Sequence, residues 1–138
     1  MGLRYKVGYA AFAVSVVTLC SAQGRFESGW LKGFTKSPTE HIIVRIEEPF
    51  MVRALKGVVL DAPGTAMHGV LVEVEDSVGH LREATTDSKG RFTFRGVHNG
   101  HFRFKVTMNG FQSVVGVIIL SNKAPRAADI RVVMHLGV

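Results

Sequence analysis

Residues 85–111 read TTDSKGRFTFRGVHNGHFRFKVTMNGF, and the alternation of apolar and polar residues is cleanest here. Phe92 and Phe94 alternate with polar residues, and Phe102 and Phe104 repeat the alternation a few positions later. Successive side chains of a strand point to opposite faces, so each run places its rings on one face of a sheet. Burial of each ring stabilises the fold by about 1.5–3 kcal/mol. The stretch therefore predicts two strands whose aromatic faces form a core.

The opposite face of these two strands is largely basic. It carries Arg91, Thr93, Arg95, His101, Arg103, Lys105 and Thr107. An antiparallel sheet commonly packs one face on the core and leaves the other in water. We therefore expect one solvent-exposed basic sheet face, and we take its four cations as a possible interaction surface: Arg91, Arg95, Arg103 and Lys105.

Short apolar runs continue on both sides of this stretch, separated by turn residues at the spacing of an all-β sandwich or barrel. We expect strands at His41–Glu47, Val52–Leu60, Gly69–Glu75, Leu81–Thr86, Arg91–Arg95, His101–Met108, Phe111–Ser121 and Ala128–Leu136. Alternation predicts further core positions at Val70, Val72, Val74, Ile130, Val132, Met134 and Leu136. The breaks between the runs contain Asp, Asn, Pro and Gly, which favour turns.

The run Val114–Leu120 is apolar on both faces apart from Gly116. Such a strand is covered on two sides, or its outer face meets another molecule. We expect the N-terminal arm to cover it, and a partner or homodimer contact is the alternative.

Several segments together carry a family resemblance: Gly57–Asp61 with Gly64, Gly69–Val74, Thr85–Phe94, Val97, Gly100, Phe102, Phe104 and Asn109–Phe111. Over roughly residues 52–136 the chain resembles the carboxypeptidase regulatory-like domain. The resemblance implies an all-β fold, a seven-stranded transthyretin-like (prealbumin-like) Greek-key β-sandwich. Members of this family act as non-catalytic modules beside metallocarboxypeptidase domains, in bacterial surface proteins and in outer-membrane receptors. The resemblance therefore implies no chemistry of the domain's own.

The first residues are typical of a signal peptide. Arg4 and Lys6 precede the apolar run Val7–Leu19, and Cys20 and Ala22 provide small residues before a cleavage site. The run is too short to span a bilayer comfortably. We expect a signal peptide at 1–22, an irregular arm at 23–39 and the sandwich domain at 40–138, in a secreted or periplasmic protein. A lipoprotein, disfavoured by Leu19, and a retained N-terminal anchor are the alternatives.

Cleavage would leave an ordinary surface charge and no thiol. It removes Cys20, the only cysteine, and two of the six excess positive charges, so the formal net charge becomes +4. No disulfide, nucleic-acid partner or stable membrane span is therefore expected of the mature chain. In the arm, Trp30 either tucks over the domain edge with Phe26 and Phe34 or belongs to a partner-binding segment, so Trp30 joins the possible interaction surface.

The histidines form no convincing metal site. His80 and Glu83 have the spacing of a metallocarboxypeptidase zinc motif, but on a strand positions three apart point to opposite faces. His98 and His101 flank a turn and are expected to be exposed. We also find no catalytic sequence motif, so we expect no enzyme activity, no metal and no cofactor.

Three classes of function remain open. The first is a non-catalytic module for protein interaction or structural support in the bacterial cell envelope, with an unknown envelope or extracellular protein as its partner. The second is a carbohydrate-binding module, and the third is a transthyretin-like hydrolase. That hydrolase family ends in Tyr-Arg-Gly-Ser, whereas this chain ends in His135–Val138. Nothing in the spacing selects a self-crosslinking set such as Lys56, Asn122 and Glu73, and the oligomeric state is not determined.

The signal peptide leads to a test of processing. We expect the exported protein to begin at Gln23, because Cys20 and Ala22 flank the cleavage site. Mass spectrometry of the exported protein measures its N-terminus. Detection of Met1 or of a diacylated Cys20 would contradict this prediction.

Overall fold

The structure is a computed structural model, and it describes residues 31–38 and 42–137. The chain divides into two compact units, Met1–Phe34 and Thr35–Val138. Of the first unit only a turn is described, in which the Phe34 amide donates to the Leu31 carbonyl at 3.0 Å. The expected signal peptide and Trp30 lie outside the described residues. None of the described residues belongs to a helix long and apolar enough to cross a membrane.

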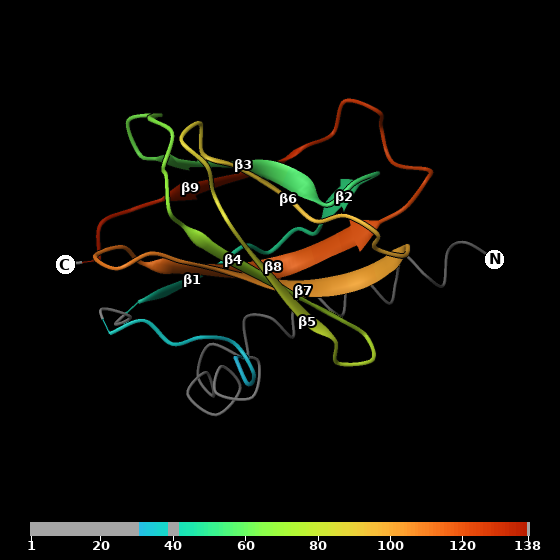
Figure 1. Ribbon diagram of the computed structural model, residues 1–138, viewed down its shortest axis with the longest axis horizontal. Coiled ribbons are helices and arrows are strands. Elements are labelled where there is room, and N and C mark those ends of the chain that lie inside the picture. Colours follow the sequence, from blue (N-terminus) through green and yellow to red (C-terminus); the bar gives the residue numbers. More distant parts are fainter. Residues whose placement is uncertain (1–30, 39–41, 138) are drawn as a thin grey trace. The chain divides into compact units, whose positions relative to one another are not determined.

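The described part of the second unit is all β. It contains nine strands: β1 Ile43–Arg45, β2 Phe50–Val52, β3 Lys56–Asp61, β4 Leu71–Asp76, β5 Leu81–Thr85, β6 Arg91–Thr93, β7 Gly100–Thr107, β8 Ser113–Leu120 and β9 Ile130–Met134. They form two mixed sheets packed as a β-sandwich (Figure 1). The expected all-β sandwich is confirmed. The resemblance implied seven strands, whereas the described residues form nine.

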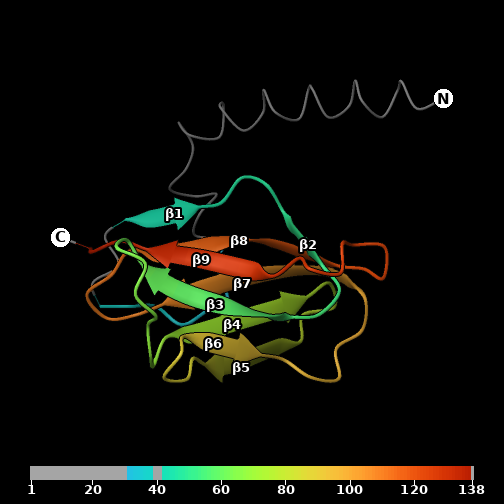
Figure 2. The same cartoon turned by 90° about the horizontal axis from the view of Figure 1, so that it is seen from above.

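The larger sheet has the order β1-β8-β7-β4-β5, and β2 also pairs with β8. The smaller sheet has the order β6-β3-β9 (Figure 2). Strands β1 and β2 run parallel to β8, and β3 runs parallel to β9, while the other pairs are antiparallel. Strand β8 therefore lies inside the larger sheet, between β7 on one side and β1 and β2 on the other.

The expected continuous strand Val52–Leu60 is wrong, because the chain bends between β2 and β3. The Lys56 amide donates to the Ala54 carbonyl at 3.0 Å, which interrupts the extended backbone. The bend turns the buried side chain of Leu55 into the core. Alternating hydrophobicity does not reveal such a bend, since both flanking segments remain apolar.

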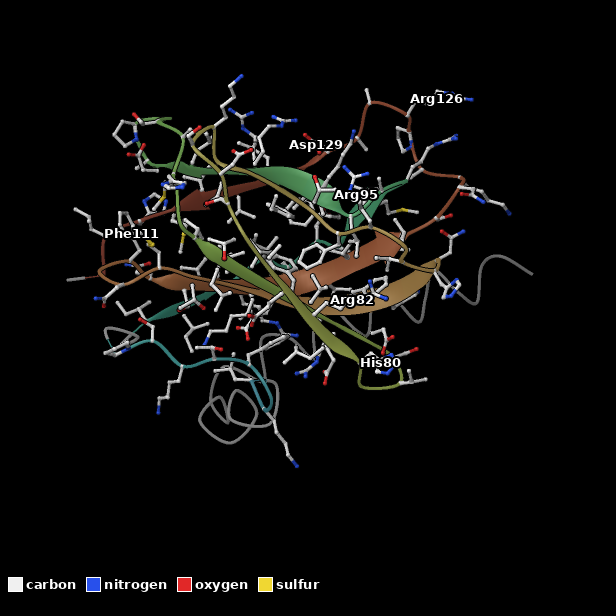
Figure 3. The ribbon with its side chains drawn as sticks, in the orientation of Figure 1. His80, Arg82, Arg95, Phe111, Arg126 and Asp129 are labelled. Atoms are coloured by element: carbon white, nitrogen blue, oxygen red, sulfur yellow. The ribbon has the colours of Figure 1, made fainter. Side chains whose placement is uncertain are left out.

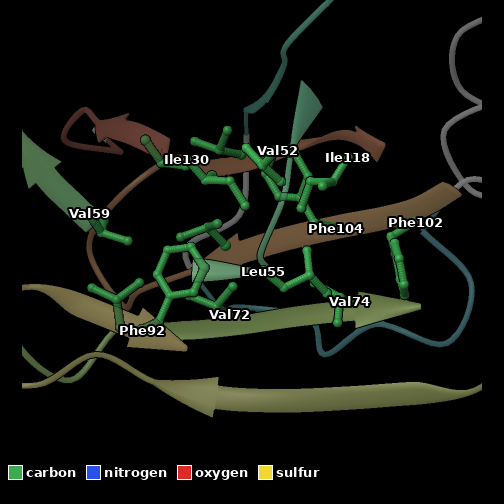
Figure 4. Close-up of a cluster of buried hydrophobic side chains, with 14 of the residues drawn as sticks. Val52, Leu55, Val59, Val72, Val74, Phe92, Phe102, Phe104, Ile118 and Ile130 are labelled. Atoms are coloured by element: carbon green, nitrogen blue, oxygen red, sulfur yellow. The ribbon is translucent and has the colours of Figure 1, made fainter. Parts of the chain in front are cut away.

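One core fills the space between the sheets (Figure 4). The larger sheet contributes Val72, Val74, Phe102, Phe104, Val106 and Ile118, and the smaller sheet contributes Val59, Phe92, Ile130, Val132 and Met134. The ring of Phe94 packs edge-on against Phe92, with centroids 6.1 Å apart. The predicted inward faces are thus confirmed, except at Leu136. That side chain is 63% exposed because it lies beyond the end of β9.

The turn before β6 is held by Asp87, as its position in the family-like stretch implies. Its Oδ1 accepts the Lys89 amide at 2.8 Å and the Arg91 amide at 3.0 Å. The Arg91 amide, followed by the Lys89 amide, lowers the pKa of this exposed carboxyl. Gly90 adopts a φ of 73°, and a Cβ there would lie 2.6 Å from the Val59 carbonyl oxygen. The turn therefore requires glycine for both its conformation and its closeness to β3.

Two glycines allow strands to approach the core closely. A Cβ on Gly116 of β8 would lie 2.7 Å from Cε2 of Phe104 on the neighbouring β7. A Cβ on Gly57 of β3 would lie 2.0 Å from the Ile130 carbonyl oxygen on β9. Gly116 thus interrupts an apolar run because the Phe104 ring occupies the space of its missing side chain.

This contact leads to a test of the core. We expect Gly116→Ala to reduce the free energy of unfolding by about 1–3 kcal/mol, because the added methyl overpacks against Phe104. In a Phe104→Leu background the same substitution should cost less, giving a coupling energy of about 1 kcal/mol or more. Urea denaturation of the four proteins measures it. Additive costs would contradict the packing described here.

Candidate interaction surfaces

The outer face of the smaller sheet is cationic. Lys56 of β3, Arg91 of β6 and Arg131 of β9 all point away from the core, because their neighbours Gly57, Phe92 and Ile130 face it. The register aligns Arg91, Val58 and Arg131 in one row across the three strands. We call this outer face, with Arg95 directly after β6, the cationic face.

Few acidic groups neutralise the cationic face. Arg91 pairs with Asp129 at 3.5 Å, and both side chains are partly exposed, so the pair is screened by solvent. Among the described residues, the side chains of Lys56, Arg95 and Arg131 form no ion pair. Figure 3 shows Arg95 and Asp129 on the side of the smaller sheet. The arrangement presents unpaired positive charge around the half-buried Val58 and the partly exposed Val133.

The structure does not bring the four expected cations together. Arg91 lies on β6 of the smaller sheet and Arg95 in the connection after it, whereas Arg103 and Lys105 lie on β7 of the larger sheet. Alternation along the chain places side chains on a face, but it does not say which consecutive strands share a sheet. The missed members of the cationic face are Lys56 and Arg131, which sit at polar positions of strands β3 and β9.

Arg103 and Lys105 are also less accessible than expected. Arg103 is half-buried and forms an ion pair with Glu75, its register partner on β4. Lys105 is only 1% exposed, so its expected exposure is wrong. Its register partner Glu73 is also 1% exposed, although alternation predicts a solvent-facing position for it. Two chargeable side chains are thus buried on the outer face of the larger sheet.

Thr35 binds both of these buried groups. Its amide donates to the Glu73 carboxylate oxygens at 3.0 and 3.1 Å, and its hydroxyl donates to Oε2 at 2.9 Å. Its carbonyl accepts from Nζ of Lys105 at 2.7 Å. One residue therefore uses its donors for the carboxylate and its acceptor for the ammonium. This part of the expected arm is fastened to the sheet.

The strand Val114–Leu120 is largely covered within the sandwich. On its outer face Val115 is buried, while Val117 and Ile119 are half-buried. Its inner face contributes Val114, Ile118 and Leu120 to the core. The strand is thus covered on its inner face by the core and is partly buried on its outer face. Cover by residues 23–30 lies outside the described part of the chain.

Comparison with known proteins shows the family to which this β-sandwich domain belongs. The described fold is a β-sandwich, and residues 54–133 match the carboxypeptidase regulatory-like domain. Because this match spans more than half of the sequence, the chain belongs to that family, as the resemblance indicated. Domains of this family are generally non-catalytic. None of the curated protein sequences matches this chain.

The solved structures found by comparison are remote. Hydroxyquinol 1,2-dioxygenase from Pseudomonas putida is 10% identical with a TM-score of 0.46, over 73% of this chain and 61% of that chain. Catechol 1,2-dioxygenase from Pseudomonas arvilla is 15% identical with a TM-score of 0.49, over 88% and 68%. 3-Chlorocatechol 1,2-dioxygenase from Rhodococcus opacus is 12% identical with a TM-score of 0.47, over 98% and 92%. At these values the likeness carries no inference about chemistry.

The buried groups around Thr35 lead to a stability test. We expect Lys105→Met to reduce the free energy of unfolding by about 3–5 kcal/mol, because it leaves the buried Glu73 carboxylate without its cationic neighbour. The double variant Glu73→Leu, Lys105→Met should regain most of that loss, since no buried charge remains. Urea denaturation measures both.

Thr35→Val is the matched control for these variants. It removes only the hydroxyl donor and keeps the backbone groups that bind Glu73 and Lys105, so the loss should be about 0.5–1.5 kcal/mol. A Lys105→Met protein as stable as the wild type would show that the buried ammonium is not needed.

Proposed function

We propose that this protein is a secreted or periplasmic non-catalytic module that docks onto an acidic surface of another protein in the bacterial cell envelope. The cationic face is its docking surface. The observation that carries this proposal is the concentration of unpaired cations on one exposed sheet face: Lys56, Arg95 and Arg131. Membership of a generally non-catalytic family supports binding rather than catalysis.

The chemistry of the cationic face favours a protein partner. Opposite charges across an interface steer encounter and fix the register of the partners. The partly exposed valines Val58 and Val133 supply apolar contact between the cations, and protein interfaces combine an apolar centre with a polar rim. An acidic protein surface with small apolar side chains among its carboxylates would match both features.

A carbohydrate-binding module is less well supported. Such modules stack sugars on exposed aromatic rings. The exposed large hydrophobic side chains of the described residues are Ile42, Met51, Val78, Leu81, Val133 and Leu136, none of which is aromatic. Apart from the half-buried Phe34, the aromatic rings in the described residues instead fill the core or pack against it, as Phe50 and Phe111 do.

Export of the protein to the cell envelope is part of the same proposal. Basic residues before an apolar run, followed by small residues at a cleavage site, support export. The cationic face lies on the domain that export would deliver to the envelope. A partner protein is therefore expected there.

Charge reversal tests the docking surface. We expect Lys56→Glu and Arg131→Glu together to lower capture of the partner from native envelope extracts about tenfold or more, because two attractive charges become repulsive. Quantitative mass spectrometry of the proteins retained on the immobilised full chain measures capture. Both positions are exposed, so the free energy of unfolding should change by no more than about 0.5 kcal/mol.

Lys36→Glu is the control for position, because it reverses one positive charge on the exposed segment bound over the larger sheet, away from the cationic face. Capture should persist in this variant and should weaken as salt is raised in the wild type. Undiminished capture by a folded Lys56→Glu, Arg131→Glu protein would refute the cationic face as the docking surface.

A further inference from the structure

A depression of about 370 Å³ lies between the β4–β5 hairpin and the β6–β7 connection. The hairpin lines it with Asp76, His80 and Arg82, and the connection and the start of β7 line it with His98 and His101. The buried side chains of Val74 and Phe102 also line it. We call this depression the histidine pocket. Its lining is distinct from the cationic face, because it contains none of Lys56, Arg91, Arg95 and Arg131.

Arg82 supplies a permanent cation with unused donors. Its two terminal nitrogens donate to the Arg95 carbonyl at 3.0 Å and to the Gly96 carbonyl at 3.5 Å. A guanidinium has five N–H donors, so three remain for a ligand. Within residues 31–38 and 42–137 no carboxylate forms an ion pair with Arg82. The backbone carbonyls thus hold the group in place without neutralising it.

Imidazoles add a charge that depends on pH. His80 and His98 line the depression from its two sides and are exposed, whereas the side chain of His101 lies on the outer face of the larger sheet, as does that of its register partner Ile119. Imidazoles in proteins commonly change their charge between about pH 5 and pH 8. In the described part of the chain no group of three or more His, Cys, Asp or Glu side chains is placed to hold a metal ion. A protonated imidazole has two N–H donors and a positive charge, which suit an anion.

Asp76 is the carboxylate that lines the pocket. Its Oδ1 accepts the His80 amide at 2.8 Å and the Val78 amide at 3.1 Å, and its Oδ2 lies 3.9 Å from Nδ1 of His80. The hydrogen bond from the His80 amide lowers the pKa of Asp76, so this carboxyl stays ionised into the acid range. At neutral pH it offsets Arg82. Each imidazole that takes up a proton then makes the pocket positive.

We propose that the histidine pocket binds the oxyanion group of a small organic acid, a carboxylate or a phosphate, and that it binds more tightly as the pH falls. The planar guanidinium of Arg82 matches the geometry of an oxyanion. His80 of the hairpin and His98 of the connection line the same depression and complete the positive site when they are protonated. Val74 and Phe102 provide an apolar floor for the rest of the ligand.

Sulfate is the probe of choice, because it keeps the same charge throughout the range from about pH 5 to pH 8 in which imidazoles titrate. Any change of affinity then comes from the protein. NMR titration of the full chain at constant ionic strength, following the imidazole resonances, measures binding. We expect saturable shifts at pH 5.5 and affinity weaker by about tenfold or more at pH 7.5, since the imidazoles lose their charge.

Two variants change the affinity in opposite directions. Arg82→Gln should weaken sulfate binding about tenfold, because it removes the permanent cation. Asp76→Asn should tighten binding at pH 7.5 about threefold or more, because it removes the opposing charge and keeps the Oδ1 acceptor. A gain of affinity cannot arise from unfolding. Arg126→Gln, on an exposed residue far from His80 in Figure 3, should leave binding unchanged.

Three results would overturn the proposal. They are the absence of saturable shifts at pH 5.5, equal affinity in a folded Arg82→Gln protein, and weaker binding by Asp76→Asn. Thermal melting of each variant establishes folding. A negative result for the histidine pocket would not contradict the proposed docking at the cationic face, because the two proposals rest on different residues and different measurements.

Discussion

The sandwich depends on how closely the aromatic face of β7 approaches its neighbours. The Phe104 ring occupies the space that a Cβ on Gly116 would need, and so it lies directly against the backbone of β8. Its own side chain is almost completely buried, with Phe50 of β2 at a ring-centroid distance of 5.9 Å. In a core packed this closely, an added methyl or a cavity lowers the stability of the fold. The inner faces of both sheets therefore have little freedom to rearrange.

The side chains of the inner faces are buried in the core. Binding sites are therefore expected on the outer faces of the sheets and at the ends of the sandwich. The two outer faces differ in kind. The smaller sheet exposes Lys56, Arg91 and Arg131 to solvent, whereas the larger sheet buries Glu73 and Lys105 beneath Thr35. Buried charges of this type seldom add net stability over apolar residues, but removing one partner is costly. Thr35 and these two side chains thus define how the start of the domain attaches to the sheet.

At one end of the sandwich, polar side chains from segments that are separate in the sequence lie around one depression. The β4–β5 hairpin brings Asp76, His80 and Arg82 to the same depression as His98 and His101. The carbonyls of Arg95 and Gly96, which bind Arg82, belong to the connection that follows β6. The strand framework positions both segments. A binding pocket at this end and a docking face on the smaller sheet can therefore coexist on one small domain.

The fold class, the family and most of the core could be predicted from the amino-acid sequence. Period-two alternation around Phe92 and Phe102 is a local property of strands, and the turn residues Asp87 and Gly90 act through their own backbone. Which strands share a sheet could not be predicted in this way and is seen in the three-dimensional structure. Sheet membership depends on pairing between distant segments, and so it separated Arg91 from Arg103, joined Lys56 to Arg131, and buried Lys105 under Thr35. Side-chain alternation carries no information about such long-range contacts, because it reports the face of a strand and not what lies opposite that face.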